Sequence, residues 1–119
     1  MALARGDLLL APFPFSDLRG MKRRPVCVVS SPAYNAGPDV VVAMVTSRPA
    51  RLARLGVGDV VIEDWELAGL RLASVVRAGR LLVIEQQLID TRLGELSASD
   101  LQQVDRGLQA VLGLSAVDA

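Results

Sequence analysis

The stretch "PVCVVSSPAYNAGPDVVVAMVTS", residues 25–47, holds the two apolar runs that say most about how this chain folds. Each run is short, dominated by valine and bounded by proline, aspartate or serine, which is typical of a β-strand. The apolar residues stand at consecutive positions rather than at alternate ones. We therefore expect both strands to be covered on both faces.

Four more runs with the same character occur along the chain. They are "GDLLLAP" (residues 6–12), "GDVVIED" (58–64), "ASVVRAG" (73–79) and "RLLVIE" (80–85). Together with the first two runs they make six closely spaced short strands, which predict a mainly β fold built on a small barrel-like sheet.

The period of the apolar residues changes in "SASDLQQVDRGLQAVLGL", residues 97–114. Ser97 stands three residues before Asp100, close to a capping-box pattern. Spacings of three and four then form one apolar stripe of Leu101, Val104, Leu108, Val111 and Leu112. This pattern predicts an amphipathic C-terminal helix that ends near Gly113.

Length and composition set the broad class of the protein. The 119 residues are expected to form a single domain, residues 1–119. The lone cysteine, Cys27, stands between valines and is expected in the core. A single cysteine cannot form an internal disulfide, and the N-terminus lacks a signal-peptide pattern, so we expect a cytoplasmic protein. No apolar run approaches the roughly 18 residues of a membrane span, and no membrane partner is expected.

The charges are balanced in number but not in position. Thirteen basic and thirteen acidic residues give a formal net charge of zero, which argues against coating nucleic acid through bulk positive potential. Residues 18–58, however, hold seven bases against one acid, and residues 71–80 add three arginines. Acidic residues gather in 59–66 and 85–119. Positive charge is therefore concentrated in segments that frame the predicted strands.

The residue types that are missing narrow the chemistry. The chain has no histidine and one cysteine, which excludes Ser-His-Asp triads, histidine metal sites and thiolate zinc sites. Neither the Gly-Lys-Ser/Thr phosphate loop nor the dinucleotide fingerprint is present. We expect no metal and no cofactor, so any catalysis must come from arginine, lysine, hydroxyls, carboxylates or backbone amides.

Four cations, Arg19, Lys22, Arg23 and Arg24, stand immediately before Pro25. A guanidinium binds phosphate oxygens at two points and can neutralise charge that grows on them in a transition state, which favours phosphodiester chemistry. The following proline biases Arg24 toward an extended conformation. A solvated hairpin loop would have the same composition, and the charge run by itself does not decide between the two interpretations.

Three segments in this order resemble one known family. The segments "GDLLLAPFPFSDLRGMKRRPVCVVSSPAYN" (6–35), "DVVVAMVTS" (39–47) and "ASVVRAGRLLVIE" (73–85) resemble the MazF/PemK growth-inhibitor toxins of bacterial type II toxin–antitoxin pairs. The resemblance implies an SH3-like barrel with a C-terminal helix and a homodimer. It also implies a metal-independent endoribonuclease that cleaves single-stranded RNA by 2′-hydroxyl attack, and an acidic, partly disordered cognate antitoxin as partner.

The resemblance carries catalytic roles to two positions. Arg24, before the proline of the second strand, would stabilise the phosphorane, and Thr46, at the end of the third strand, would bond the scissile phosphate or orient the 2′-hydroxyl. The side chains expected to bind RNA are Arg19, Lys22, Arg23, Ser47, Arg48, Arg77 and Arg80. Where many RNA-cleaving members have a Glu-Gln pair, this chain has Gly79 and Arg80, which leaves the base preference open.

The sequence does not decide the roles of the aromatic residues or exclude alternative functions. Phe13 and Phe15 could stack on RNA bases or plug the end of the barrel, and Trp65 could pack or meet a partner. The CcdB gyrase poisons resemble this fold but act through a C-terminal Trp-Gly-Ile, whereas this chain reads "GLSAVDA" over residues 113–119. A CcdB-like protein-binding module, or an RNA-binding module without catalysis, is the alternative to the nuclease.

Overall fold

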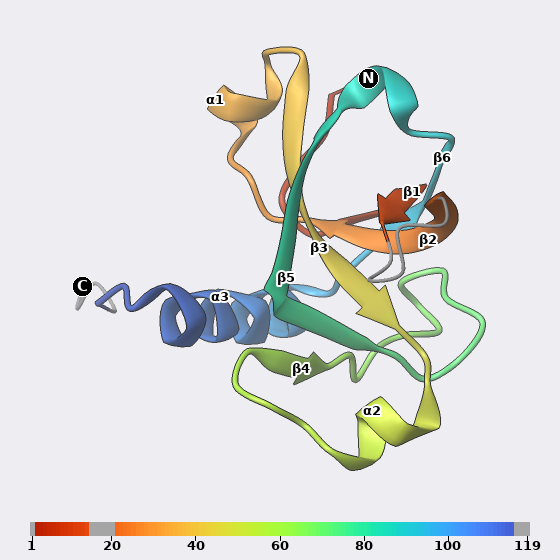
Figure 1. Cartoon of the computed structure of the whole chain (residues 1–119), viewed down its shortest axis with the longest axis vertical. Coiled ribbons are helices and arrows are strands. Elements are labelled where there is room, and N and C mark those ends of the chain that lie inside the picture. The colour runs from red at the N-terminus through yellow and green to blue at the C-terminus, as the bar shows by residue number, and fades with distance from the viewer. Residues whose placement is uncertain (1, 15–20, 116–119) are drawn as a thin grey trace.

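The computed structural model describes residues 2–14 and 21–115 of the chain. Its centre is a six-stranded antiparallel sheet in the order β4-β5-β3-β2-β1-β6 (Figure 1). The strands are β1 (Asp7–Pro14), β2 (Met21–Val28), β3 (Asp39–Thr46), β4 (Asp59–Val61), β5 (Val75–Glu85) and β6 (Thr91–Glu95). The helices are α1 (Pro32–Asn35), α2 (Pro49–Ala53), the 3-10 turn η1 (Gln86–Leu88) and α3 (Ala98–Leu112).

The sheet is strongly curved but its edges do not pair. β4 and β6 are the two edge strands, and the turn segment 62–70 fills the space between them instead of a strand ladder. A Cβ atom at Gly94 would overlap the carbonyl oxygen of Ala68, and one at Gly69 would overlap that of Leu93. The mainly β fold with a C-terminal helix is confirmed, and the barrel-like sheet is completed by turn packing rather than by hydrogen bonds between strands.

Three strand predictions differ from the structure. The runs 73–79 and 80–85 belong to one strand, β5, which bends where Ala43 pairs with Leu81 and Met44 pairs with Arg77. Figure 1 shows this bend beside α3. β6 was not predicted, because "TRLGE" has a single large apolar residue. β2 begins at Met21, so "MKRR" lies within the strand and not in a loop before it.

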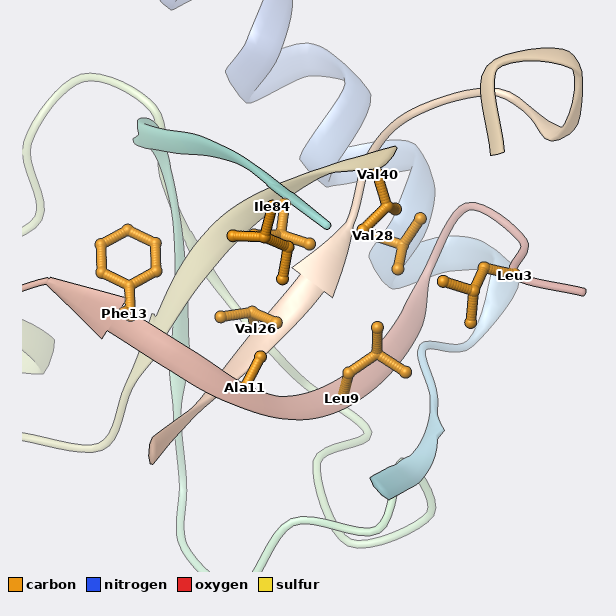
Figure 2. Packing of buried hydrophobic residues seen from close by; sticks show 9 residues of the cluster. Leu3, Leu9, Ala11, Phe13, Val26, Val28, Val40 and Ile84 are labelled. Carbon is orange, nitrogen blue, oxygen red and sulfur yellow. The ribbon is translucent and has the colours of Figure 1, made fainter. Parts of the chain in front are cut away.

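The two faces of the sheet carry separate hydrophobic clusters. Figure 2 shows the first core cluster, which contains Leu3, Leu9, Ala11, Phe13, Val26, Val28, Val40, Val42 and Ile84. The second core cluster contains Leu8, Cys27, Ala43, Val45, Ile62, Ala68, Val76, Leu96 and Val104. Successive residues of one strand alternate between the clusters because side chains alternate across a strand. The expectation that the strands are covered on both faces is therefore correct.

The helix α3 covers the second core cluster as the sequence predicts. The Ser97 hydroxyl accepts a hydrogen bond from the Asp100 backbone N–H, and Gly113 ends the helix in the left-handed conformation at φ 71°. Leu101, Val104 and Leu108 pack on the cluster. The stripe is not buried to its end, because Val111 and Leu112 are 36% and 52% exposed.

The Asp100 carboxylate fastens α3 to the turn that fills the sheet edge. It is buried and accepts hydrogen bonds from the backbone N–H groups of Glu63 and Asp64 at 3.1 and 3.0 Å. The first turn of α3 thus holds the start of segment 62–70 in place. In the part of the chain that the structure describes, none of the helices combines the length and apolar character needed to cross a bilayer.

Candidate active site

Arg24 and Thr46 stand at corresponding positions of neighbouring strands. β2 and β3 pair from Val26 opposite Met44 to Val28 opposite Val42. Two residues beyond the Val26–Met44 pair, this register leads to Arg24 on β2 and Thr46 on β3. Because side chains alternate along each strand, both residues belong to the face of the first core cluster.

Pairing with β1 fixes the strand that carries Arg24. Ala11 lies opposite Arg24, and Leu10 lies opposite Pro25. Pro25 has no backbone N–H to donate and is tolerated here because the β2–β3 register only begins at Val26. Arg24 therefore projects from a paired, extended backbone and not from a loop.

The charge of Arg24 is held in an unfavourable environment. The side chain is half-buried, and burial together with the nearby positive charge of Arg48 lowers the pKa of Arg24 from its usual value. Two like charges brought together in this way favour the binding of an anion, which would relieve the repulsion between them. A phosphate group is an anion with the geometry that guanidinium groups bind.

The Thr46 hydroxyl is oriented by the chain that follows it. Thr46 is buried at 5% exposure, and its Oγ1 accepts a hydrogen bond from the backbone N–H of Arg48 at 3.3 Å. A hydroxyl that accepts this bond keeps its own hydrogen for donation to another group. The same short turn thus orients Thr46 and brings the Arg48 side chain close to Arg24.

The other residues predicted to bind RNA are distributed unevenly around this pair. Ser47 and Arg48 are exposed directly beyond Thr46. Arg77 lies on β5 opposite Met44, and its Nε donates a hydrogen bond to the carboxylate of Asp59 at 3.2 Å. Arg77 is therefore next to the site but engaged by a nearly buried carboxylate.

The remaining cations lie elsewhere or outside the described residues. Arg23 belongs to the opposite face from Arg24 and forms an ion pair with Asp90. Arg80 is exposed at the bend of β5. Arg19 lies outside the described residues, and Lys22 is described only through its backbone pairing with Phe13. Arg23 and Arg24 thus lie on opposite faces of β2.

A pocket on the face of the second core cluster, opposite to the face of Arg24 and Thr46, was not predicted from the sequence. It has a volume of about 390 Å³ and is lined by Leu10, Pro25, Ser47, Gly69, Leu70, Arg71, Leu72, Ser74 and Leu93. These residues come from β1, β2 and β6, from the residue that follows β3, and from the chain between Gly69 and Ser74. No local pattern in the sequence could have indicated it, because it forms only where distant segments meet.

The aromatic side chains are mostly structural. Phe13 is buried in the first core cluster, so its interpretation as a plug of the barrel-like sheet is correct (Figure 2). Trp65 packs against the second core cluster, and Phe15 lies outside the described residues. Among the residues described, no group of three or more histidine, cysteine, aspartate and glutamate side chains could hold a metal ion.

Comparison with known proteins gives one consistent result. Residues 4–112 match the family described as PemK-like, MazF-like toxin of type II toxin-antitoxin system. Endoribonuclease MazF6 of Mycobacterium tuberculosis (strain ATCC 25618 / H37Rv) is 34% identical over 117 residues, covering 96% of this chain and 100% of that protein. Endoribonuclease MazF2 of Mycobacterium bovis matches with the same identity and coverage.

Solved structures with the same fold include two toxin–antitoxin complexes. A mycobacterial endoribonuclease in complex with its cognate antitoxin has a TM-score of 0.77 at 21% identity, covering 98% of this chain and 100% of that one. The MazE–MazF complex of Deinococcus radiodurans (Form-III) has a TM-score of 0.74 at 26% identity, covering 97% and 100%. The fold described above is that of these structures.

Proposed function

Because this chain belongs to the PemK-like, MazF-like toxin family of type II toxin–antitoxin systems, we propose that it cleaves single-stranded RNA at a site formed by Arg24 and Thr46. The chain is the toxin of such a pair, and its 34% identity to endoribonuclease MazF6 over 117 residues makes it an endoribonuclease. The observation that carries the site assignment is the register that aligns Arg24 with Thr46 on one face of the sheet.

The proposed reaction is attack by the ribose 2′-hydroxyl on the neighbouring phosphorus. The 2′-oxygen forms a bond to phosphorus while the bond to the leaving 5′-oxygen breaks. The 2′-hydroxyl loses its proton to water and the 5′-oxygen takes one up, which gives a 2′,3′-cyclic phosphate and a 5′-hydroxyl. Unpaired RNA suits this step because a duplex resists the in-line arrangement of the three atoms.

Arg24 stabilises the charge that builds up on the phosphorane. A guanidinium with a pKa far above neutrality is a poor proton donor, whereas two N–H groups aimed at phosphate oxygens stabilise the transition state strongly. The half-burial of Arg24 and the positive charge of Arg48 beside it support this role. Thr46 donates its hydroxyl hydrogen to the scissile phosphate or holds the 2′-hydroxyl in line.

The side chains proposed to bind RNA are Arg19, Lys22, Arg23, Ser47, Arg48, Arg77 and Arg80. Of these, Ser47 and Arg48 are exposed directly beyond Thr46. The contributions of these cations are expected to differ, because Arg23 and Arg77 already contact the carboxylates of Asp90 and Asp59. Binding should weaken with salt in proportion to the number of phosphates that the cations contact.

The proposed assembly is a cytoplasmic homodimer that an acidic, partly disordered antitoxin inhibits by covering the cationic site. Apolar side chains support self-association. Leu112 and Leu114 are exposed near the end of α3, and Leu55 and Val57 are exposed before β4. The close approach of Val111 to Gly58 brings these two segments together into one apolar surface that a second copy could bury.

The decisive experiment is cleavage of single-stranded RNA by the purified protein in EDTA. We expect unchanged activity with EDTA, 5′-hydroxyl and cyclic phosphate ends, and no cleavage when the nucleotide that supplies the 2′-hydroxyl is replaced by a deoxynucleotide. Strict dependence on Mg²⁺, or cleavage of the deoxy substrate, would refute the mechanism. Intact RNA with a shifted band would instead indicate a binding module.

Arg24→Ala tests the catalytic role of Arg24 in the same cleavage assay. We expect cleavage to fall by about 10²-fold or more, as for other lost transition-state contacts. Denaturant unfolding should show that the variant remains folded, so that the loss of activity is not a loss of structure. A folded Arg24→Ala protein with normal activity would contradict the assignment.

A further inference from the structure

An ion pair between Arg77 and Asp59 lies on the same face of the sheet as the proposed cleavage site. Arg77 on β5 pairs with Met44 on β3, and Met44 packs against the first core cluster. On its other side, Arg77 pairs with Asp59 on β4. Residues directly opposite each other on neighbouring strands have their side chains on one face. Arg77 therefore shares its face with Arg24 and Thr46.

Arg77 is close enough to the cleavage site to contact the RNA backbone there. Val75 lies directly opposite Thr46, and Arg77 is the next residue of β5 on the same face. Diagonal neighbours of this kind are about 7–8 Å apart, a distance that a long side chain can span. The Arg77 side chain is 20% exposed, so part of it is accessible to a ligand.

The contact with Asp59 occupies one part of the Arg77 guanidinium. The Nε atom donates a hydrogen bond to Oδ1 of Asp59 at 3.2 Å, and within residues 2–14 and 21–115 the guanidinium makes this hydrogen bond alone. A guanidinium carries five N–H donors in a rigid plane, and four of them belong to the two terminal nitrogens. These four are left for a ligand, and two of them can bind one phosphate at two points.

The Asp59 carboxylate is itself held in place by the turn that precedes β4. Its Oδ2 accepts a hydrogen bond from the Gly56 N–H at 2.8 Å, and the Asp59 N–H donates to the Gly56 carbonyl oxygen at 3.1 Å. Gly58 in this turn has φ +86°, and a Cβ atom there would overlap the side chain of Val111 on α3. The Asp59 side chain is 3% exposed. One carboxylate oxygen is thus anchored to the turn while the other contacts Arg77.

We propose that Asp59 is a positioning residue, which holds Arg77 so that its terminal nitrogens bind the RNA backbone beside the scissile phosphate. This inference rests on the proposed ribonuclease function. A long side chain loses conformational entropy when it binds a ligand, and a side chain that is already held in place loses less. A carboxylate that withheld the guanidinium from RNA would engage it at two points, whereas Asp59 engages Nε.

A second ion pair of the same construction lies away from the site and provides a control. Oδ1 of Asp7 accepts a hydrogen bond from Arg92 at 3.2 Å, and its Oδ2 accepts one from the Ala4 N–H at 2.8 Å. The Asp7 side chain is 5% exposed, and the turn before it contains Gly6 at φ +90°. Asp7 begins β1, at the end of the strand remote from its pairing with Arg24. The two aspartates therefore match in local contacts and burial and differ in their distance from the site.

A double-mutant cycle on kcat/KM for cleavage of single-stranded RNA tests the proposal. The variants are Asp59→Asn, Arg77→Ala, the combination of the two, and Asp7→Asn, and denaturant unfolding verifies that each is folded. We expect Asp59→Asn and Arg77→Ala each to lower kcat/KM by about tenfold, the size typical of a lost hydrogen bond to a charged group. The double variant should be no slower than Arg77→Ala, and Asp7→Asn should cleave at the wild-type rate.

Arg77→Lys tests the same role without any change at Asp59. Lysine keeps the positive charge but lacks both Nε and the planar fork, so we expect its kcat/KM to lie close to that of Arg77→Ala. Wild-type activity of Arg77→Lys would overturn the proposal.

Two results of the cycle would also overturn it. The first is a similar loss of activity when Asp59→Asn is added to Arg77→Ala, or when Asp7→Asn is made, because Asp59 would then act through the stability of its turn. The second is faster cleavage or tighter RNA binding by Asp59→Asn, which would mean that the carboxylate withholds Arg77 from the RNA.

Failure of this inference is distinguishable from failure of the proposed function. The same cycle is measured as dissociation constants, with RNA that lacks the scissile 2′-hydroxyl and cannot be cut. Arg77→Ala should lower the slope of log K against log salt by about 0.7, the contribution of one phosphate of a single strand. A protein that binds RNA without cutting it still reports whether Asp59 and Arg77 are coupled. Cleavage that requires Arg24 but shows no such coupling would leave the nuclease assignment intact and refute the positioning role alone.

Discussion

Thr46→Val separates the catalytic role of the Thr46 hydroxyl from its structural role. The substitution replaces a hydroxyl by a methyl group at nearly constant shape. Thr46 is 5% exposed, and its Oγ1 accepts one hydrogen bond, from the Arg48 N–H at 3.3 Å. The variant therefore removes one acceptor for Arg48 and one donor for the scissile phosphate, while the surrounding packing is kept.

The two losses differ in size. A hydrogen bond to a charged group contributes about 1.5–3 kcal/mol, which predicts a fall in kcat/KM of roughly 10- to 150-fold. The hydrogen bond to Arg48 is neutral and long, and it falls at the low end of about 0.5–1.5 kcal/mol. Burial of the added methyl group offsets about 0.8 kcal/mol of that loss. The free energy of unfolding should therefore change by less than about 1 kcal/mol.

Thr46→Ser is the matched control because it keeps the hydroxyl and removes the methyl group. We expect kcat/KM within a few-fold of wild type, and a loss of about 1 kcal/mol in stability from the deleted buried methyl. The assay is cleavage of a fluorogenic RNA at fixed salt, combined with denaturant unfolding of each variant. Equal activity of the valine and serine variants, or wild-type kcat/KM for Thr46→Val, would refute the role given to this hydroxyl.

Three other predictions concern single residues. Arg48→Pro keeps the backbone conformation, since Arg48 has φ −63°, but removes the N–H group that orients Thr46. The kcat/KM of this variant should be a few-fold below that of Arg48→Ala. Equal rates of the two variants would show that the Arg48 N–H does not contribute to catalysis. Asp100→Ala should lower the free energy of unfolding by about 2–4 kcal/mol, measured by denaturant unfolding. The reason is that the backbone N–H groups of Glu63 and Asp64 lose the buried carboxylate to which they donate. Burial raises the pKa of Cys27 to about 12, so the thiol of the folded protein should resist alkylation at pH 8. The free energy of unfolding should fall as the pH rises above about 9, because the thiol ionises in the unfolded chain before it ionises in the folded one. Rapid alkylation of the folded protein would contradict this.

Local patterns in the sequence were sufficient to predict the helices and strands that have a strong hydrophobic periodicity. The predicted ends of α3 match the structure because Ser97 and Gly113 cap it through contacts within a few residues. The strands around Val26 and Val42 were found because their apolar runs have both faces covered. β6 was missed because an edge strand packed against a turn needs little apolar character of its own.

Charge and proline misled the sequence-based prediction at the start of β2. Lysine, arginine and Pro25 are unusual in a central strand, so the cationic run was expected to precede the strand. The structure tolerates them because β2 from Met21 to Pro25 pairs with β1, whereas its β3 partner is reached only at Val26. Strand pairing thus assigns Arg24 and Arg23 to opposite faces, which composition alone could not do.

The sequence by itself determined which residue types are available for catalysis, because side-chain identity decides whether a phosphate can be bound and whether an imidazole or a set of zinc-binding thiolates is present. It also determined most of the strands and the helix, since these depend on periodicity over a few residues. Only the tertiary structure decided that Thr46 aligns with Arg24, that Arg48 comes near both, and that a pocket forms where Leu10, Pro25 and Ser47 meet the chain between Gly69 and Ser74. Register and bends join residues that are far apart in the chain, and they are set by long-range packing that no short stretch of sequence contains.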